Sequence, residues 1–110
     1  MAVAMLIDNP NGSQEIYEQL RERIGLEKPA GGIFHVAGPS PNGGWRVIEI
    51  WESEEDAKRF LAERLRPAAE AVGAAPPPPP ELWPVHNYMT GVAGSPASEP
   101  TTSPVGAEGT

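Results

Sequence analysis

The side chains with the most versatile chemistry in this chain are its two histidines, His35 and His86, each within a short apolar segment. A histidine has an unperturbed pKa of about 6.5, so either one could act as a general base near neutral pH. The simpler role for each is a half-buried histidine that hydrogen bonds to the backbone or to a second subunit. Both are therefore candidate catalytic residues.

The densest polar cluster on any expected strand is His86, Asn87 and Tyr88. Strand alternation places His86 and Tyr88 on one face and Asn87 on the other. A histidine beside a tyrosine can handle a proton on a phenol or an enol, which makes His86 and Tyr88 candidate catalytic residues and Asn87 a candidate for substrate binding. Packing of this strand against a second subunit is the competing explanation.

Glu49 is the carboxylate that we expect to be desolvated, because Val47, Ile48 and Trp51 surround it in the sequence. Burial disfavours the charged form of a carboxyl group and raises its pKa, which would bring Glu49 toward a useful range for catalysis. The alternative is a structural ion pair with Arg46 or with an arginine from a helix.

Several aromatic residues could line a substrate pocket suited to a flat polycyclic molecule, or could equally form ordinary core. These residues are Trp45, Trp51, Tyr17, Phe34 and Phe60. The sequence has no cysteine, no glycine-rich phosphate loop and no clustered metal-ligand spacing. We therefore expect neither a metal nor a cofactor.

The apolar segments and turn signals predict the element order β-α-β-β-α-β. The expected strands are Val3–Ile7, Ile33–Ala37, Trp45–Glu52 and Leu82–Met89, with a helix from Ser13 or Asn11 to Gly25 and a second helix over Glu54–Val72. This order is the ferredoxin-like arrangement, an α+β fold with an antiparallel four-stranded sheet. Its strand order places the two histidines at opposite edges of the sheet, so they are not expected to share a metal ion.

Local signals refine the second helix and its exit. Ser53 with Asp56 three residues later is typical of a helix N-cap, and Pro67 predicts a kink near Arg66. The five prolines at 76–80 predict a stiff connector back to the sheet, with an SH3 ligand as the less favoured interpretation.

The third expected strand is partly apolar on both faces. Trp45, Val47 and Trp51 lie on one face, while Ile48 and Ile50 lie on the other. Two helices can cover only one side of the sheet, so the second apolar side needs another cover. An identical sheet from a second copy is the simplest cover, and we expect a homodimer.

Composition separates a folded domain, residues 1–89, from a flexible tail rich in Gly, Pro, Ser and Thr, residues 90–110. The tail lacks Leu, Ile, Phe, Tyr and Trp and cannot bury enough apolar surface to offset its ordering entropy. The chain carries a formal net charge of -7 without a Lys/Arg patch, so nucleic acid is not an expected partner. No apolar run approaches the ~20 residues of a membrane span, and we expect a cytoplasmic protein that does not associate with membranes.

Four segments carry a family resemblance: GGIFHVAG, WRVIEIWESEEDAKRF, LRPA and PVHNYM, at residues 31–38, 45–60, 65–68 and 84–89. With the element order, they make residues 3–89 similar to the dimeric alpha-beta barrel proteins, and within them to the small bacterial group related to antibiotic biosynthesis monooxygenases. The resemblance implies two ferredoxin-like subunits packed sheet to sheet, each with a small-molecule pocket between its own sheet and helices.

The resemblance also bears on the reaction. Haem-degrading relatives carry a tryptophan in the setting of Trp51, but the second helix here lacks the histidine expected as an axial ligand. Haem degradation is therefore not expected, and Trp51 is more readily a core or pocket-wall residue. Polyketide-cyclase relatives combine a histidine with a tyrosine, although the local sequence here does not match theirs.

Three functions remain open at this point. The first is a cofactor-independent monooxygenase acting on an aromatic or polyketide-like substrate, with His86 or His35 as base. The second is a cyclase or isomerase that uses the same residues for proton transfer without oxygen. The third is a non-catalytic ligand-binding or accessory protein that holds a small apolar or aromatic molecule.

Overall fold

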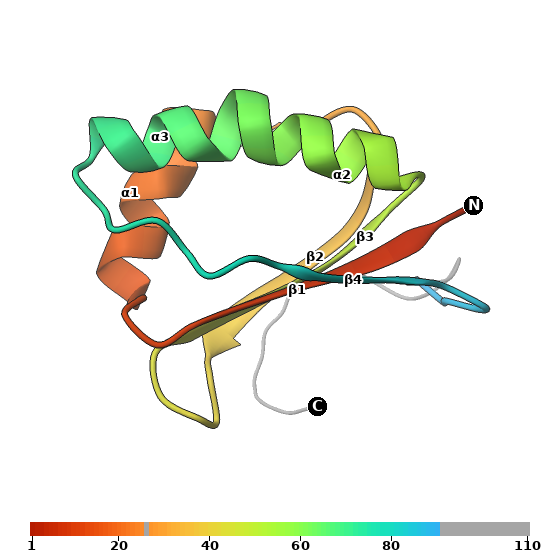
Figure 1. The fold of residues 1–110 in the computed structure, drawn as a ribbon, viewed down its shortest axis with the longest axis horizontal. Helices are drawn as coiled ribbons and strands as arrows, with labels where there is room; N and C mark the ends of the chain where they lie inside the picture. The colour runs from red at the N-terminus through yellow and green to blue at the C-terminus, as the bar shows by residue number, and fades with distance from the viewer. Residues whose placement is uncertain (26, 91–110) are drawn as a thin grey trace.

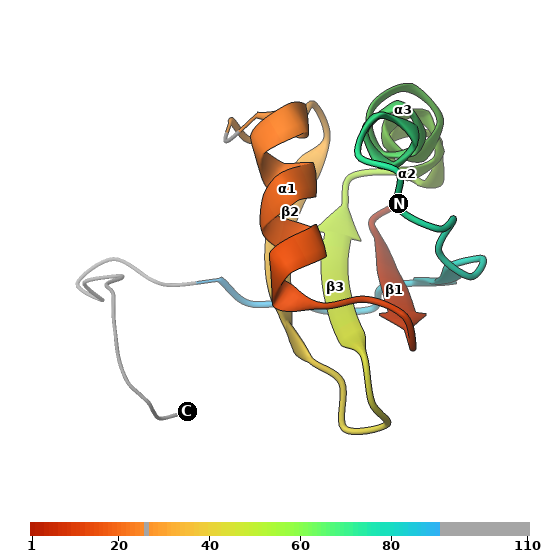
Figure 2. The same ribbon diagram turned by 90° about the vertical axis from the view of Figure 1, so that its left-hand side faces the viewer.

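The computed structural model describes residues 1–25 and 27–90, and the predicted tail lies outside them from residue 91 onward. The strands are β1 (Val3–Asn9), β2 (Gly32–Pro39), β3 (Trp45–Trp51) and β4 (Glu81–Pro84); the helical segments are α1 (Gln14–Ile24), α2 (Glu54–Phe60), η1 (Leu61–Leu65) and α3 (Arg66–Ala71). The predicted α+β, ferredoxin-like fold is confirmed. All helical segments lie on one face of the sheet (Figures 1 and 2).

The sheet has the strand order β2-β3-β1-β4, with every neighbouring pair antiparallel. The central part of β3 places Glu49 opposite Met5 of β1 on one side and opposite His35 of β2 on the other. A register shift between Gly32 and Phe34 sets this pairing. Because of that shift, His35 shares the helix-facing side of the sheet with Glu49, whereas Phe34 lies opposite Ile50 on the other side.

Helix α1 begins after a serine N-cap and ends at a glycine, as its local sequence predicts. The Ser13 hydroxyl accepts a hydrogen bond from the backbone N–H of Ile16 at 3.2 Å, which identifies Ser13 rather than Asn11 as the N-cap. Gly25 ends the helix with φ at 101°, a conformation that glycine adopts without strain. The Arg64 guanidinium donates to the Ile24 carbonyl and so ties this end of α1 to the second helical unit.

The second helical unit runs from α2 through η1 to α3 and accommodates Pro67 by changing its hydrogen-bond pattern. The Arg66 N–H donates to the Leu61 carbonyl five residues earlier, the spacing of a π-helical turn. Proline cannot donate and its ring crowds the preceding turn, so the wider turn lies where the interruption was predicted. Figure 1 shows α2 and α3 following one another along one coil.

The packed core lies under α2 and not under α1. Its buried residues are Val3, Met5, Ile7, Trp51 and Ala57, with Val47, Phe60, Leu61, Leu65 and Leu82 packed against them. Helix α1 contains no buried residue, although Ile16, Leu20 and Ile24 repeat along one side of it. The apolar side of α1 therefore faces incompletely filled space.

Strand β4 is shorter than predicted. It ends at Pro84, and only one further backbone bond, from the Val85 N–H to the Ala2 carbonyl at 2.9 Å, follows it. Val3, the first residue of β1, lies opposite Pro84, so the strand that β4 pairs with begins at this point and the pairing goes little further. The prediction of a strand reaching Met89 is wrong, and the alternation argument for His86 and Tyr88 loses its basis. Within residues 1–25 and 27–90, no helix is long and apolar enough to cross a membrane.

Candidate functional site

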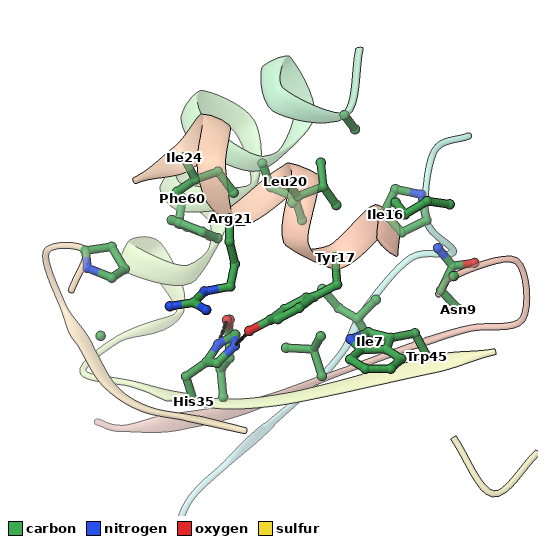
Figure 3. A pocket seen from close by; sticks show the side chains of 18 of the residues that line it. Ile7, Asn9, Ile16, Tyr17, Leu20, Arg21, Ile24, His35, Trp45 and Phe60 are labelled. Atoms are coloured by element: carbon green, nitrogen blue, oxygen red, sulfur yellow. Dashed lines mark hydrogen bonds and ion pairs between the residues drawn. The ribbon is translucent and has the colours of Figure 1, made fainter. Parts of the chain in front are cut away.

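A cavity of about 390 Å³ lies between α1, the second helical unit and the helix-facing side of the sheet. That volume falls within the range of small-molecule sites, roughly 300–1,000 Å³. Its apolar lining includes Ile7, Ile16, Leu20, Ile24, Val47, Phe60 and Leu65. Figure 3 shows Tyr17 and Arg21 pointing from α1 across this space toward the strands.

A continuous chain of polar contacts runs along the cavity wall from α1 to the centre of the sheet. The Tyr17 hydroxyl lies 2.6 Å from Nε2 of His35. Nδ1 of His35 lies 2.7 Å from Oε2 of Glu49. Figure 3 shows the Tyr17 ring reaching from α1 to the His35 imidazole. A phenol, an imidazole and a carboxylate thus come from three elements, α1, β2 and β3.

The carboxylate of Glu49 is held at both oxygens. Glu49 is 7% exposed, and its Oε1 accepts a hydrogen bond from the indole Nε1 of Trp51 at 3.0 Å. An indole N–H can only donate, and a carboxylate only accepts, so the remaining oxygen accepts from Nδ1–H of His35. Glu49 does not pair with Arg46, which instead bonds Asp8 on the opposite side of the sheet at 2.7 Å.

These contacts assign the proton positions of the relay. With Nδ1 of His35 protonated toward Glu49, Nε2 carries the lone pair and accepts from the Tyr17 hydroxyl. Burial raises the pKa of Tyr17 above its ordinary value of 10.0, and the negative charges of Glu18 and Glu49 add to this effect, while Arg21 opposes it. Tyr17 is therefore a protonated donor at neutral pH.

The histidine is the accessible member of the relay. Its side chain is 46% exposed, whereas that of Glu49 is 9% exposed. The Tyr17 ring stacks on the imidazole with centroids 5.9 Å apart and also contacts Trp45, at 5.5 Å. A ligand in the cavity can therefore approach the Tyr17–His35 pair, while Glu49 stays behind it in the sheet.

Most of the sequence-predicted site residues line this cavity: His35, Glu49, Tyr17, Trp45, Trp51, Phe34 and Phe60. Trp51 is 1% exposed and its ring packs 5.1 Å from that of Phe60, so it forms part of the core as well as the wall. Phe34 borders the cavity only from its place in β2: it is 41% exposed, and its register directs its side chain to the other face of the sheet with Ile50, contrary to its predicted role as an aromatic pocket wall.

The predicted cluster His86, Asn87 and Tyr88 lies elsewhere. All three residues are exposed, follow the end of β4 and are absent from the cavity lining. His35 lies on β2, one edge strand of the sheet, whereas His86 follows β4, the other edge strand, and is part of no strand. Among the described residues, no group of three or more His, Cys, Asp or Glu side chains is placed to hold a metal ion.

Sequence reasoning missed Arg21, which lines the cavity one helical turn beyond Tyr17. It also missed the relay itself, since Tyr17 was considered only as a wall residue. A signal was present: Tyr17 and Arg21 are each adjacent in sequence to the apolar positions Ile16 and Leu20, and so border the side of α1 that faces the sheet.

No protein-family model matches the chain, and no curated protein matches its sequence. Solved structures do share its fold. A protein of Chloroflexus aurantiacus J-10-fl named as an antibiotic biosynthesis monooxygenase has a TM-score of 0.56 at 14% identity, covering 81% of this chain and 98% of that one. SnoaB of Streptomyces nogalater, a cofactor-independent oxygenase, has a TM-score of 0.54 at 14% identity, covering 80% and 95%. The predicted structural resemblance to antibiotic biosynthesis monooxygenases is confirmed at the level of the fold.

Proposed function

We propose that this protein is a cofactor-independent monooxygenase of the bacterial cytoplasm that acts on an aromatic or polyketide-like molecule bound in the cavity beside α1. The observation that carries the proposal is the Tyr17–His35–Glu49 relay, which opens onto a largely apolar space of small-molecule size. The fold shared with SnoaB, itself a cofactor-independent oxygenase, supports the same reaction class.

The first step is removal of an acidic proton from the substrate. As the substrate C–H or O–H proton passes to the Tyr17 oxygen, the Tyr17 proton passes to Nε2 of His35, 2.6 Å away. The products are a substrate carbanion or enolate and an imidazolium that is paired with Glu49 through Nδ1. A positioned general base of this kind contributes about 10²–10⁴-fold in rate.

The second step needs only molecular oxygen as co-reactant. The carbanion supplies the electrons, a carbon–oxygen bond forms, and the resulting peroxide anion takes back the proton from the imidazolium of His35. Loss of water from this hydroperoxide, with removal of the second hydrogen on the same carbon, leaves a carbonyl group. One substrate and one O₂ thus give one oxygenated product and one water, and the protein returns to its starting protonation state.

The environment of the relay favours this chemistry. Glu49 is buried, so water screens its charge less than that of an exposed carboxylate, even though the His35 side chain is half exposed. Its two hydrogen bonds fix the carboxylate and thereby the orientation of the imidazole. The side chain needs no rearrangement when positive charge develops on His35.

We further propose that two copies associate through the sheet face that the helices leave uncovered. The register places Phe34, Val36, Ile48, Ile50 and Trp83 on that face, and exposed fractions of 41%, 48% and 44% remain for Phe34, Val36 and Trp83. An apolar area of this kind supports a sheet-to-sheet homodimer. Sedimentation should report a dimer, and Val36→Asp should shift it toward monomer; a wild-type monomer at high concentration would overturn the dimer.

Oxygen uptake tests the proposed reaction. A hydroxylated anthrone is incubated with the protein in an oxygen electrode, in parallel with an anaerobic sample, and the products are followed by mass spectrometry. The expected result is one O₂ consumed for each molecule of quinone formed above the uncatalysed rate. Catalysed conversion without oxygen would instead favour a cyclase or isomerase. Tight binding without conversion would favour a non-catalytic binding protein.

A further inference from the structure

Arg21 places a cation at the cavity, beside the relay. It lies one helical turn beyond Tyr17 on α1 and is part of the cavity lining. Figure 3 shows its side chain extending from α1 toward the Tyr17 hydroxyl and the His35 imidazole. No step of the proposed oxygenation uses this guanidinium.

The donors of Arg21 are largely uncommitted within the described part of the chain. Its one ion pair there joins Nη1 to Oε1 of Glu18 at 3.7 Å, and the two side chains are 45% and 56% exposed. A loose pair between exposed side chains contributes little and is easily exchanged. The planar guanidinium therefore retains the geometry to bind a carboxylate through two parallel hydrogen bonds.

The local charges favour an anion at this point despite the acidic chain. The formal net charge is -7, so the overall field does not attract anionic molecules. At the cavity, however, the buried carboxylate of Glu49 is already engaged by His35 and Trp51. Lys28 adds a second cation to the lining and Glu27 an opposing anion, leaving Arg21 as the cation next to the reactive pair.

We propose that the substrate is an acid, a fused-ring aromatic compound whose carboxylate pairs with Arg21 while its reactive ring carbon or hydroxyl faces Tyr17 and His35. This inference rests on the proposed function and names the chemical class of its substrate. Arg21 then determines specificity: it selects acidic substrates and sets which ring position lies against the relay. The neutral part of the molecule lies along the apolar side of α1.

The test compares two isosteric probes, 1-hydroxy-2-naphthoic acid and 1-hydroxy-2-naphthamide, which differ in the negative charge. Their binding is measured by isothermal titration calorimetry without oxygen, on wild type, Arg21→Gln, Arg21→Lys and Arg23→Gln. Arg23 is the matched control, because it is an exposed arginine of the same helix outside the cavity lining. Circular dichroism verifies that each variant is folded.

We expect wild type to bind the acid at least about 10-fold more tightly than the amide, because only the acid can form a charge-assisted hydrogen bond with Arg21. Arg21→Gln should reduce that ratio to within about 2-fold, Arg21→Lys should retain part of it, and Arg23→Gln should leave it unchanged. The inference would be overturned if Arg21→Gln kept the wild-type ratio of acid to amide affinity. It would also be overturned if wild type showed no preference for the acid or bound neither probe. Because the assay involves no turnover, acid selectivity without oxygen uptake would contradict the reaction and leave the acid site standing.

Discussion

The chain contains two histidine–tyrosine pairs, and they lie in different environments in the structure. His86 and Tyr88 are two residues apart, yet both are exposed beyond the end of β4. Tyr17 and His35 are eighteen residues apart in sequence, yet they are hydrogen bonded in a cavity and backed by a buried carboxylate. Proximity along a strand is thus a weaker guide to chemistry than the register that brings separate elements together.

Replacing each histidine in turn should produce the largest difference between the two pairs. His35→Ala should lower kcat/KM for oxygen-dependent turnover about 10²–10⁴-fold, because the relay loses its base. His86→Ala should change it less than about 2-fold, because its side chain lies outside the cavity lining. Steady-state oxygen uptake measures both variants. The reverse ranking would transfer the catalytic role to the cluster after β4.

The buried carboxylate should come next in effect. Glu49→Gln keeps a side-chain oxygen that can accept from Trp51 but removes the charge that stabilises the imidazolium. It should lower kcat/KM about 10- to 100-fold, the size of effect seen when a group that supports a metal-ligating histidine is lost. Glu52→Gln, at an exposed position just beyond β3, is the matched control. Equal activity of the two variants would show that His35 does not need the charge of Glu49.

Tyr17→Phe should change how the stability of the protein depends on pH. Since burial raises the pKa of Tyr17 in the folded protein, the folded state holds a proton that the unfolded state loses above about pH 10. Stability from this group is complete below the unfolded pKa and is lost as pH rises through the folded one. Tyr17→Phe should therefore make urea unfolding less sensitive to pH above 10. It should also lower kcat/KM about 10-fold, because Nε2 of His35 must then take the substrate proton directly, without the Tyr17 hydroxyl between them.

The control for that variant is Tyr88→Phe, which removes an exposed hydroxyl remote from the cavity lining. It should leave turnover unchanged. If Tyr88→Phe reduced turnover as strongly as Tyr17→Phe, the distinction between the two pairs would fail.

The smallest expected effect concerns the cap that positions Tyr17. Ser13→Ala removes the acceptor for the Ile16 N–H and should lower the free energy of unfolding by about 1 kcal/mol, measured by urea titration. Ser53→Ala removes the equivalent cap of α2 and should cost a similar amount. Only Ser13→Ala should also weaken ligand binding, by a few-fold. Equal ligand affinities in the two variants would show that the start of α1 does not help to position the site.

The scaffold could be predicted because its signals are local. Ser13, Ser53 and Gly25 act within one turn of helix, and strand alternation is enough to place Glu49 and Trp51 on one face. The end of β4 has a different origin, because it lies where β1 begins: Val3, the first residue of β1, is opposite Pro84. The strand predicted over His86 and Tyr88 therefore has no stretch of β1 beside it.

The relay could not be predicted in the same way. Its geometry depends on the register shift between Gly32 and Phe34, which turns His35 to the helix-facing side opposite Glu49. It also depends on how α1 lies across the sheet, which brings Tyr17 to that histidine. Both are properties of packing between elements: the position of Tyr17 beside Ile16 indicates the side of α1 that it borders, but not the residue that it meets on the sheet.

Nitrogen-15 NMR of the histidine side chains at about pH 8.5 shows which ring nitrogen of His35 carries the proton, with His86→Gln to assign the signals of the two histidines. We expect neutral His35 to carry its proton on Nδ1, toward Glu49, and to leave Nε2 as an acceptor for Tyr17. His86 should show nitrogen signals that are averaged over its two tautomers, as in a histidine exposed to water. A proton on Nε2 of neutral His35 would contradict the relay, and with it the assignment of His35 as the base.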